Sequence, residues 1–125
     1  MPAIDFLESC PMKVAANLIA VLDAVAEAPP PRYSDGGKWE AMHGAMGGYF
    51  EVRASGPGRG QFRLFCILEN ADPTELSRRC LPSPAIVVLT GLRKPWRTKF
   101  GERDYRAVRV LGNDHTSHVP RRIAE

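Results

Sequence analysis

Several patterns that would place a chain in a familiar functional class are missing from this sequence of 125 residues. No apolar run approaches the length of a membrane span, and the first acids precede the first base, unlike the layout of a signal peptide. No glycine-rich phosphate loop, HExxH motif, GxSxG motif or acid pair spaced for glycoside or metal chemistry occurs. These absences lead us to expect a cytoplasmic protein with no membrane partner, no metal site and no cofactor.

Cysteine and histidine are scarce, with three of each. Cys10, Cys66 and Cys80 are widely spaced and form no CxxC pair, so neither a zinc knuckle nor a disulfide framework is predicted. We interpret them as reduced thiols, with Cys66 serving as a small apolar side chain in a strand. His43 is the one histidine outside the C-terminal region.

The composition is that of one globular domain over residues 1–125, with 44% hydrophobic and 25% charged residues. The net charge of +3 is unevenly distributed. Residues 1–30 hold one base and four acids, whereas residues 91–125 hold nine bases and four acids. A chain polarised in this way favours an anionic partner for its C-terminal third.

Helical periodicity dominates residues 4–28. Apolar residues recur along one face at spacings of three and four, at Val14, Leu18, Val21, Leu22 and Val25. Because proline is tolerated in the first turn, Pro11 predicts a second helix beginning there, after a short helix at 4–8. The three prolines at 29–31 end this helix.

After a polar connection at 32–48, the apolar residues recur at every second position, which is the spacing of a strand. Strands are predicted at 49–53, 62–68 and 85–90, separated by a hairpin loop at 55–60 and a long loop at 69–84. The third strand is apolar throughout, which predicts a central strand covered on both faces. A short final helix at 102–110 and a flexible tail at 112–125 complete the chain.

This order of elements predicts an α+β fold. An antiparallel sheet of three or more strands, with the two N-terminal helices packed on one face, is the simplest way to bury the apolar sides of these elements.

Several basic residues lie at positions where a structural role alone does not explain them. Arg53 and Arg63 lie in predicted strands, and a lone arginine in an apolar strand costs stability unless it is used or reaches solvent. The segment 91–100 interleaves bases with aromatic residues, namely Arg93, Lys94, Trp96, Arg97, Lys99 and Phe100. That pattern suits phosphate binding combined with base stacking. Packing of the aromatic residues on the sheet, and simple exposure of Arg53, are the structural alternatives.

An enzyme with this inventory relies on arginine, lysine and tyrosine, and one reaction suits that set. RNA carries its own nucleophile, the 2′-hydroxyl group. A protein that holds this group in line and neutralises the charge on the phosphate in the transition state accelerates strand cleavage. One well-placed donor of this kind contributes roughly 3 kcal/mol.

Four short motifs and a following threonine, in this order and spacing, resemble the phage-related HigB branch of the RelE/ParE toxin superfamily. They are FLESCP at 6–11, GYFEVR at 48–53, FRLF at 62–65, TGLRKP at 90–95 and Thr98. The resemblance extends from about residue 6 to residue 110. It implies a RelE-like fold, a helix-turn-helix antitoxin as partner, and cleavage of mRNA, often on the ribosome.

The resemblance also assigns roles to individual residues. Arg53, Arg63, Arg93 and Lys94 take the positions of the family's catalytic, phosphate-binding bases. Arg97, Lys99, Trp96, Tyr105 and His43 are the expected RNA-binding residues, with Phe100 and Tyr105 as candidates for the family's C-terminal aromatic. No metal takes part. Two alternatives stay open: a ParE-like poison of DNA gyrase, and a non-catalytic relative that only binds nucleic acid or a partner protein.

Overall fold

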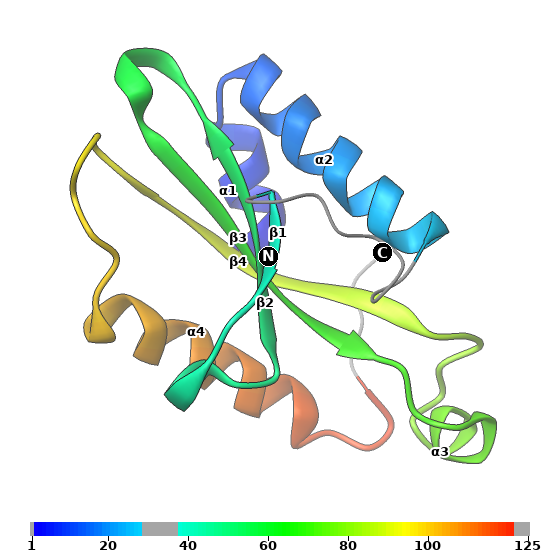
Figure 1. The fold of residues 1–125 in the computed structure, drawn as a ribbon. Helices are drawn as coiled ribbons and strands as arrows, with labels where there is room; N and C mark the ends of the chain where they lie inside the picture. The colour runs from blue at the N-terminus through cyan, green and yellow to red at the C-terminus, as the bar shows by residue number, and fades with distance from the viewer. Residues whose placement is uncertain (1, 29–37, 122–125) are drawn as a thin grey trace.

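The structure is a computed structural model that describes residues 2–28 and 38–121 (Figure 1). Its helices are α1 (Pro2–Ser9), α2 (Met12–Glu27), α3 (Pro73–Arg78) and α4 (Glu102–Thr116), with 3-10 turns at Gly44–Met46 and Pro57–Arg59. Its strands are β1 (Trp39–Ala41), β2 (Tyr49–Ser55), β3 (Gln61–Glu69) and β4 (Ala85–Lys94). The predicted α+β class, the two N-terminal helices and the C-terminal helix are confirmed.

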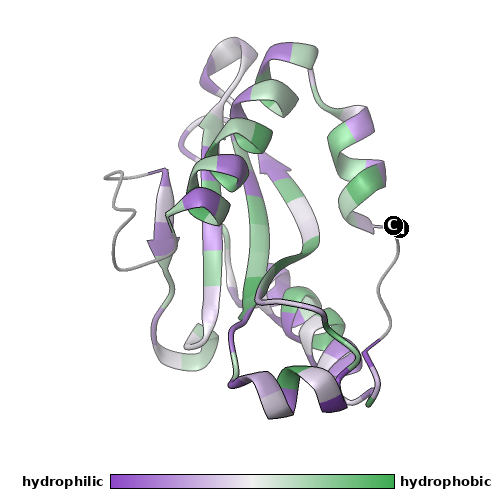
Figure 2. Cartoon of the chain, turned by 90° about the vertical axis from the view of Figure 1, so that its right-hand side faces the viewer, coloured by the Kyte–Doolittle hydropathy of each residue, from purple (hydrophilic) through white to green (hydrophobic). Residues whose placement is uncertain are grey.

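The strands form one antiparallel sheet in the order β1-β2-β3-β4. Helices α1 and α2 cover one face, as predicted for the N-terminal pair, and α4 covers the other (Figure 1). Figure 2 shows largely hydrophobic strands at the centre and helices that alternate between hydrophilic and hydrophobic positions. Such amphipathic helices bury one side against the sheet.

The core on the α2 face follows the periodicity of the sequence. Val14, Leu18, Val21 and Val25 of α2 are buried against Val52, Leu64 and Cys66 of the sheet. Pro11 stands at the N-cap of α2, as expected for a residue that opens a helix without needing its own amide hydrogen bond. Burial of each valine or leucine side chain contributes about 1.5–3 kcal/mol.

The core on the α4 face is built from the side of β3 that faces away from α2. Alternation along β3 sends Leu64 and Cys66 to the α2 face and Phe65 to the α4 face, and all three are buried because helices cover both faces. The register irregularity between Phe65 and Cys66 leaves Leu89 of β4 without a partner in the ladder, and Leu89 joins the core on the α4 face. Phe65 packs with Val108 of α4, and its ring makes an edge contact with Tyr105 at 6.1 Å between centroids. This packing fixes the N-terminal half of α4 beside the strands.

Strand β4 is an edge strand, not the central strand that its apolar sequence predicted. The run is apolar because α1 packs on one of its faces and α4 on the other. Gly91 allows α1 to approach closely, since a Cβ atom there would lie 2.1 Å from the ring of Phe6. Coverage by two helices therefore produced the pattern that parallel or central strands usually show.

Two elements lie in segments predicted as loops. Strand β1 occupies part of the expected 32–48 connection and pairs with β2, where Trp39 opposes Val52 and stacks on Phe50 at 5.0 Å. Helix α3 lies in the expected 69–84 loop, where the Asp72 side chain accepts a hydrogen bond from the Glu75 amide. The prolines at 29–31 and residues 32–37 lie outside the described residues.

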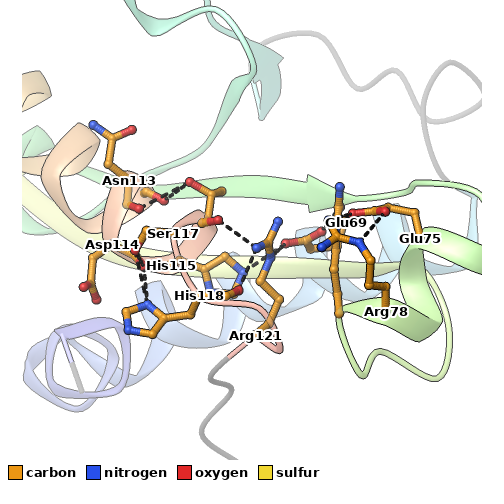
Figure 3. A network of polar contacts seen from close by, with 12 residues as sticks. Glu69, Glu75, Arg78, Asn113, Asp114, His115, Ser117, His118 and Arg121 are labelled. Atoms are coloured by element: carbon orange, nitrogen blue, oxygen red, sulfur yellow. Dashed lines mark hydrogen bonds and ion pairs between the residues drawn. The ribbon is translucent and has the colours of Figure 1, made fainter.

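The expected tail at 112–125 also differs from the structure. Helix α4 continues to Thr116, because Gly112 accommodates the Tyr49 side chain against the helix. Beyond it, Arg121 returns to the sheet and donates from Nε to Glu69 Oε1 at 2.9 Å (Figure 3). The described part of this segment, up to residue 121, is thus hydrogen-bonded to the body of the protein, while 122–125 lie outside it.

Candidate functional site

The main cavity of the α4 face lies where the β2–β3 hairpin meets the loop between β4 and α4, two segments that Figure 1 places at the same end of the sheet. Its volume is about 870 Å3. The lining residues are Ser55, Arg59, Gln61, Arg63, Trp96, Arg97, Thr98, Lys99, Phe100 and Tyr105. Four of these are cationic and none is acidic, so we refer to this space as the cation cavity. An anion with several oxygen atoms is the complementary ligand.

Strand pairing brings the two strand arginines together. Arg53 of β2 and Arg63 of β3 are direct partners across the ladder, and both side chains point to the α4 face. Glu51, two residues before Arg53, points the same way and is only 6% exposed. Arg53 donates to Glu51 through Nε at 2.7 Å and through Nη2, whereas Arg63 Nε lies 3.9 Å from the carboxylate. The two guanidinium groups are therefore held side by side by one buried acid.

The positive charge of Arg63 is only loosely compensated. Burial lowers the pKa of its guanidinium, and Glu51 partly opposes this effect. An arginine nonetheless stays protonated in a protein, so the site carries a poorly hydrated cation. Its close hydrogen bonds go to neutral acceptors, the Phe62 carbonyl at 3.2 Å and the Gln61 side chain at 3.2 Å. Such a cation gains strongly from an anionic ligand.

Gln61 connects Arg63 to the loop that carries the other bases. Its Nε2 atom donates to the carbonyl groups of Pro95 at 3.1 Å and Thr98 at 2.6 Å, while its Oε1 atom accepts from Arg63 Nη2. Thr98 closes the same turn by donating its amide to Pro95 at 3.1 Å. Gln61 therefore fixes the distance between the strand arginine and the loop.

The loop presents an exposed aromatic ring between cations. Trp96 is 49% exposed, and the guanidinium groups of Arg97 and Arg59 lie 4.4 Å and 4.8 Å from its ring centre. Phe100 lies beneath Arg63 at 5.3 Å and makes an edge contact with Phe65, so this ring belongs to the packing of the sheet. A base can stack on Trp96, whereas Phe100 supports Arg63.

Tyr105 forms the wall at the opposite side of the cation cavity. Burial raises the pKa of its phenol, with Glu51 acting in the same direction and the two strand arginines opposing it. The group is therefore protonated at neutral pH and can donate a hydrogen bond or a proton.

The predicted basic pair after the last strand is split between the two faces of the sheet. Arg93 opposes Phe62 in the β3–β4 ladder and lies on the α1 face, where Nη2 donates to the Ser9 carbonyl at 2.8 Å. Lys94 opposes Gln61 on the cavity side, but it pairs with Asp104 at 3.4 Å and does not line the cavity. Alternation along a strand sends consecutive side chains to opposite faces, so both could not reach one phosphate.

His43 lies in a second, smaller cavity that shares Tyr105 with the first. Its volume is about 360 Å3, and its lining residues are Glu40, Ala41, Met42, His43, Ala45, Met46, Glu51, Arg53, Glu102 and Tyr105. Three of these are acidic and one is an arginine, so we refer to this space as the acidic cavity. His43 is exposed at its rim.

Sequence analysis missed Glu51 and Gln61 as site residues. The period of two had already put Glu51 on the same face as Arg53, which was a usable signal. Gln61 gave no signal, because its role depends on a loop 34 residues further along the chain.

The described residues include no group of three or more His, Cys, Asp or Glu side chains arranged to hold a metal ion. Cys10, Cys66 and Cys80 are free thiols, and burial raises the pKa of Cys66 to about 12. In the part of the chain that the structure describes, no helix combines the length and the apolar character needed to cross a membrane.

Comparison of the chain with protein-family models, with curated proteins and with solved structures gave no match.

Proposed function

We propose that the protein is a cytoplasmic toxin of the RelE/HigB type, an endoribonuclease that cleaves mRNA, on the ribosome, without a metal ion. The observation that carries this proposal is the cation cavity, which has four bases, no acid and an exposed tryptophan. Phosphate groups supply the anions and unpaired bases supply the rings for such a surface.

The proposed reaction uses the 2′-hydroxyl group of RNA as nucleophile. Its oxygen attacks the adjacent phosphorus atom, the bond from phosphorus to the 5′-oxygen breaks, and a 2′,3′-cyclic phosphate and a 5′-hydroxyl group form. Arg63 neutralises the developing charge on the phosphate oxygens together with Lys99, which lines the same cavity. Arg53 lies beside Arg63 in the ladder but is paired with Glu51 and does not line the cation cavity. Glu51 and Gln61 hold Arg63 in place and touch no reacting atom.

Two side chains are available to move protons in this reaction. Tyr105 stays protonated at neutral pH and donates a proton to the departing 5′-oxygen. His43 lines the adjoining cavity, and its imidazole is the side chain assigned to accept the proton of the 2′-hydroxyl group. Arg93 and Lys94 have no part in this step, since neither lines the cation cavity.

The positive charge of the cation cavity also supports the proposed protein partner. A helix-turn-helix antitoxin that inserts an acidic segment over the cation cavity neutralises the bases and blocks access of RNA. The prediction is that the chain co-purifies with the product of a neighbouring gene, and that RNA competes with this partner.

The deciding experiment is induction of the chain in a bacterial host, followed by pulse labelling of protein and DNA. We expect protein synthesis to stop first, and the Arg63→Ala variant to restore growth while remaining folded. If DNA synthesis stops first, the protein is a gyrase poison of the ParE type. A folded Arg63→Ala variant that stays fully toxic contradicts the proposal.

A second candidate function is RNA binding without cleavage. The observation that favours it is that three of the four expected catalytic bases, Arg53, Arg93 and Lys94, do not line the cation cavity. This alternative predicts no effect of induction on growth, together with RNA affinity that falls steeply with salt concentration.

A further inference from the structure

The acidic cavity lies next to the proposed path of the RNA backbone, with Tyr105 as the shared wall. Its volume of about 360 Å3 lies within the usual range of small-molecule sites, roughly 300–1,000 Å3. Its residues come from β1, β2, the turn at Gly44–Met46 and the first turn of α4. A nucleotide whose phosphate lies beside Arg63 is thus positioned to place its base in this cavity.

The two neighbouring cavities differ in charge. The cation cavity is lined by four bases and no acid, whereas the acidic cavity is lined by Glu40, Glu51 and Glu102 against Arg53. A phosphate group is repelled from the acidic cavity. A group that donates hydrogen bonds is attracted, because an ionised carboxylate only accepts them.

Two of these carboxylates retain acceptor capacity for a ligand. Glu40 contacts Arg53 through Oε2 at 3.1 Å, and Glu102 contacts Arg109 through Oε1. Their side chains are 42% and 57% exposed, so the remaining oxygen atoms reach the solvent of the cavity. Glu51, in contrast, is buried and holds the strand arginines.

The rest of the cavity suits a flat ring. Met42, Ala45, Met46 and Tyr105 are the apolar and aromatic residues of its lining. Methionine side chains adapt their shape and make favourable contacts with aromatic rings. An apolar wall with a few hydrogen-bonding groups at the rim is the usual construction of a site for a small aromatic ligand.

We propose that the acidic cavity is a base-recognition site, which takes a nucleobase bearing an exocyclic amino group and excludes uracil. Adenine donates to a carboxylate through its N6 amino group and cytosine through its N4 amino group, while uracil presents the O4 carbonyl at the place of the cytosine amino group. Guanine has its amino group at a different edge, N2, which uracil also lacks. This inference rests on the proposed RNA-binding function and adds the selection of the base beside the cleaved phosphate. Glu40 and Glu102 are the residues that determine the specificity.

The test uses the full chain and single-stranded oligouridylates of about eight nucleotides, a length typical of single-strand sites. The central nucleotide carries adenine, cytosine, guanine or uracil, and every sugar of the oligonucleotide is 2′-deoxy so that binding is measured without cleavage. We expect at least one amino-bearing base to bind about 5-fold to 100-fold more tightly than uracil. The Glu40→Gln/Glu102→Gln double variant loses this ratio.

The Glu75→Gln variant is the matched control, because Glu75 pairs with Arg78 on α3, away from both cavities. It removes an acid in the same way and leaves the ratio unchanged. If the double variant only binds all oligonucleotides more tightly and keeps the ratio, the acids act by general repulsion and the proposal is wrong.

Failure of this inference and failure of the proposed function give different results. Equal, salt-sensitive binding of all four oligonucleotides, lost in Arg63→Ala, overturns base recognition and leaves RNA binding intact. The absence of any RNA binding overturns both. A cationic segment of a protein is the other ligand that this charge pattern fits. Oligolysine binding that depends on Glu40 and Glu102, without base discrimination, assigns the cavity to a protein partner and overturns the proposal.

Discussion

Two buried glutamates, Glu69 and Glu51, differ in how closely the arginines around them contact the carboxylate. Glu69 is 2% exposed and accepts from Arg79 at 2.6 Å, from Arg121 at 2.9 Å and, through His115 Nε2, at 3.1 Å (Figure 3). Glu51 is similarly buried, but its contact with Arg63 is 3.9 Å long.

The difference distinguishes a structural network around Glu69 from a candidate binding site around Arg63. Around Glu69, Arg79, Arg121 and His115 all contact the carboxylate closely, and Arg121 Nη1 also donates to the carbonyl groups of Thr116 and His118. Arg63, in contrast, lines an open cavity with further cations and holds only neutral acceptors closely. A buried charge that is incompletely paired lowers the stability of the fold. A protein keeps such a charge where a ligand completes the pairing.

The largest effect that this comparison predicts is on stability at Glu69. The Glu69→Ala variant leaves Arg79, Arg121 and His115 without their shared acceptor, so we expect the free energy of unfolding to fall by about 3–5 kcal/mol. Urea denaturation measures this change. The Glu75→Ala variant removes a partly exposed acid that pairs with Arg78 and with the outer side of Arg79, and it leaves Glu69 in place, so it is expected to cost only about 1 kcal/mol. Similar losses in both variants would remove the distinction between the network and the surface.

The next effect is on function at Arg63. In Arg63→Ala, we expect the rate of RNA cleavage to fall by about 10²-fold to 10³-fold, because a donor to the transition-state phosphate is lost. Stability should change by no more than about 1 kcal/mol, since no close ion pair is broken. Single-turnover cleavage and urea denaturation measure the two quantities. Arg78→Ala, which removes an equal charge from α3, is the control and should leave cleavage unchanged.

These two arginine environments indicate what the sequence could and could not predict. Helices α1, α2 and α4 and strands β2 to β4 followed from apolar spacing, and alternation alone put Arg53 and Glu51 on one face. Strand β1 was missed because three residues show no period. Helix α3 had a usable signal in Asp72 and Pro73, a cap followed by proline in the first turn.

The site was less predictable than the elements. The separation of Arg93 from Arg63 depends on the register of β3 against β4, which no local pattern specifies. The tie between Arg121 and Glu69 joins positions 52 residues apart, so a basic C-terminal segment looked like a solvated tail. Long-range pairing, rather than local propensity, decided which bases became structural and which face the cavity.

Acid should weaken the Glu69 network by a smaller amount than deletion, because protonation removes the charge and keeps the side chain. Burial raises the pKa of Glu69, but the hydrogen bonds from Arg121, Arg79 and His115 together bring it below the ordinary value of 4.5. The ionised form is thus favoured by folding, and its contribution is present above about pH 4.5 and is lost as the pH falls through the folded pKa. Urea denaturation at decreasing pH measures it.

The Glu69→Gln variant provides the comparison for this titration. Its stability deficit relative to the unmodified protein should be largest near neutral pH and should shrink below about pH 4.5, since the wild-type carboxylate is then protonated as well. A deficit that stays constant across this range would mean that Glu69 is not ionised in the folded protein.

The smallest predicted effect is at Gln61, which couples the two halves of the cation cavity. In Gln61→Ala, the loop loses two hydrogen bonds to the Pro95 and Thr98 carbonyl groups. At about 0.5–1.5 kcal/mol each, their loss should weaken RNA binding by about tenfold. Ser117→Ala, which also removes one hydrogen bond from a side chain to a backbone carbonyl, is the remote control.

Tryptophan fluorescence separates a loop effect from a general loss of stability in Gln61→Ala. Trp39 is buried and Trp96 is half-exposed, so acrylamide quenching in the folded state reports mainly on Trp96. We expect quenching to increase in Gln61→Ala and to fall again when RNA stacks on the ring. Weaker binding with unchanged quenching would mean that Gln61 contacts the RNA directly, and that the spacing between Arg63 and the loop is set by the strands alone.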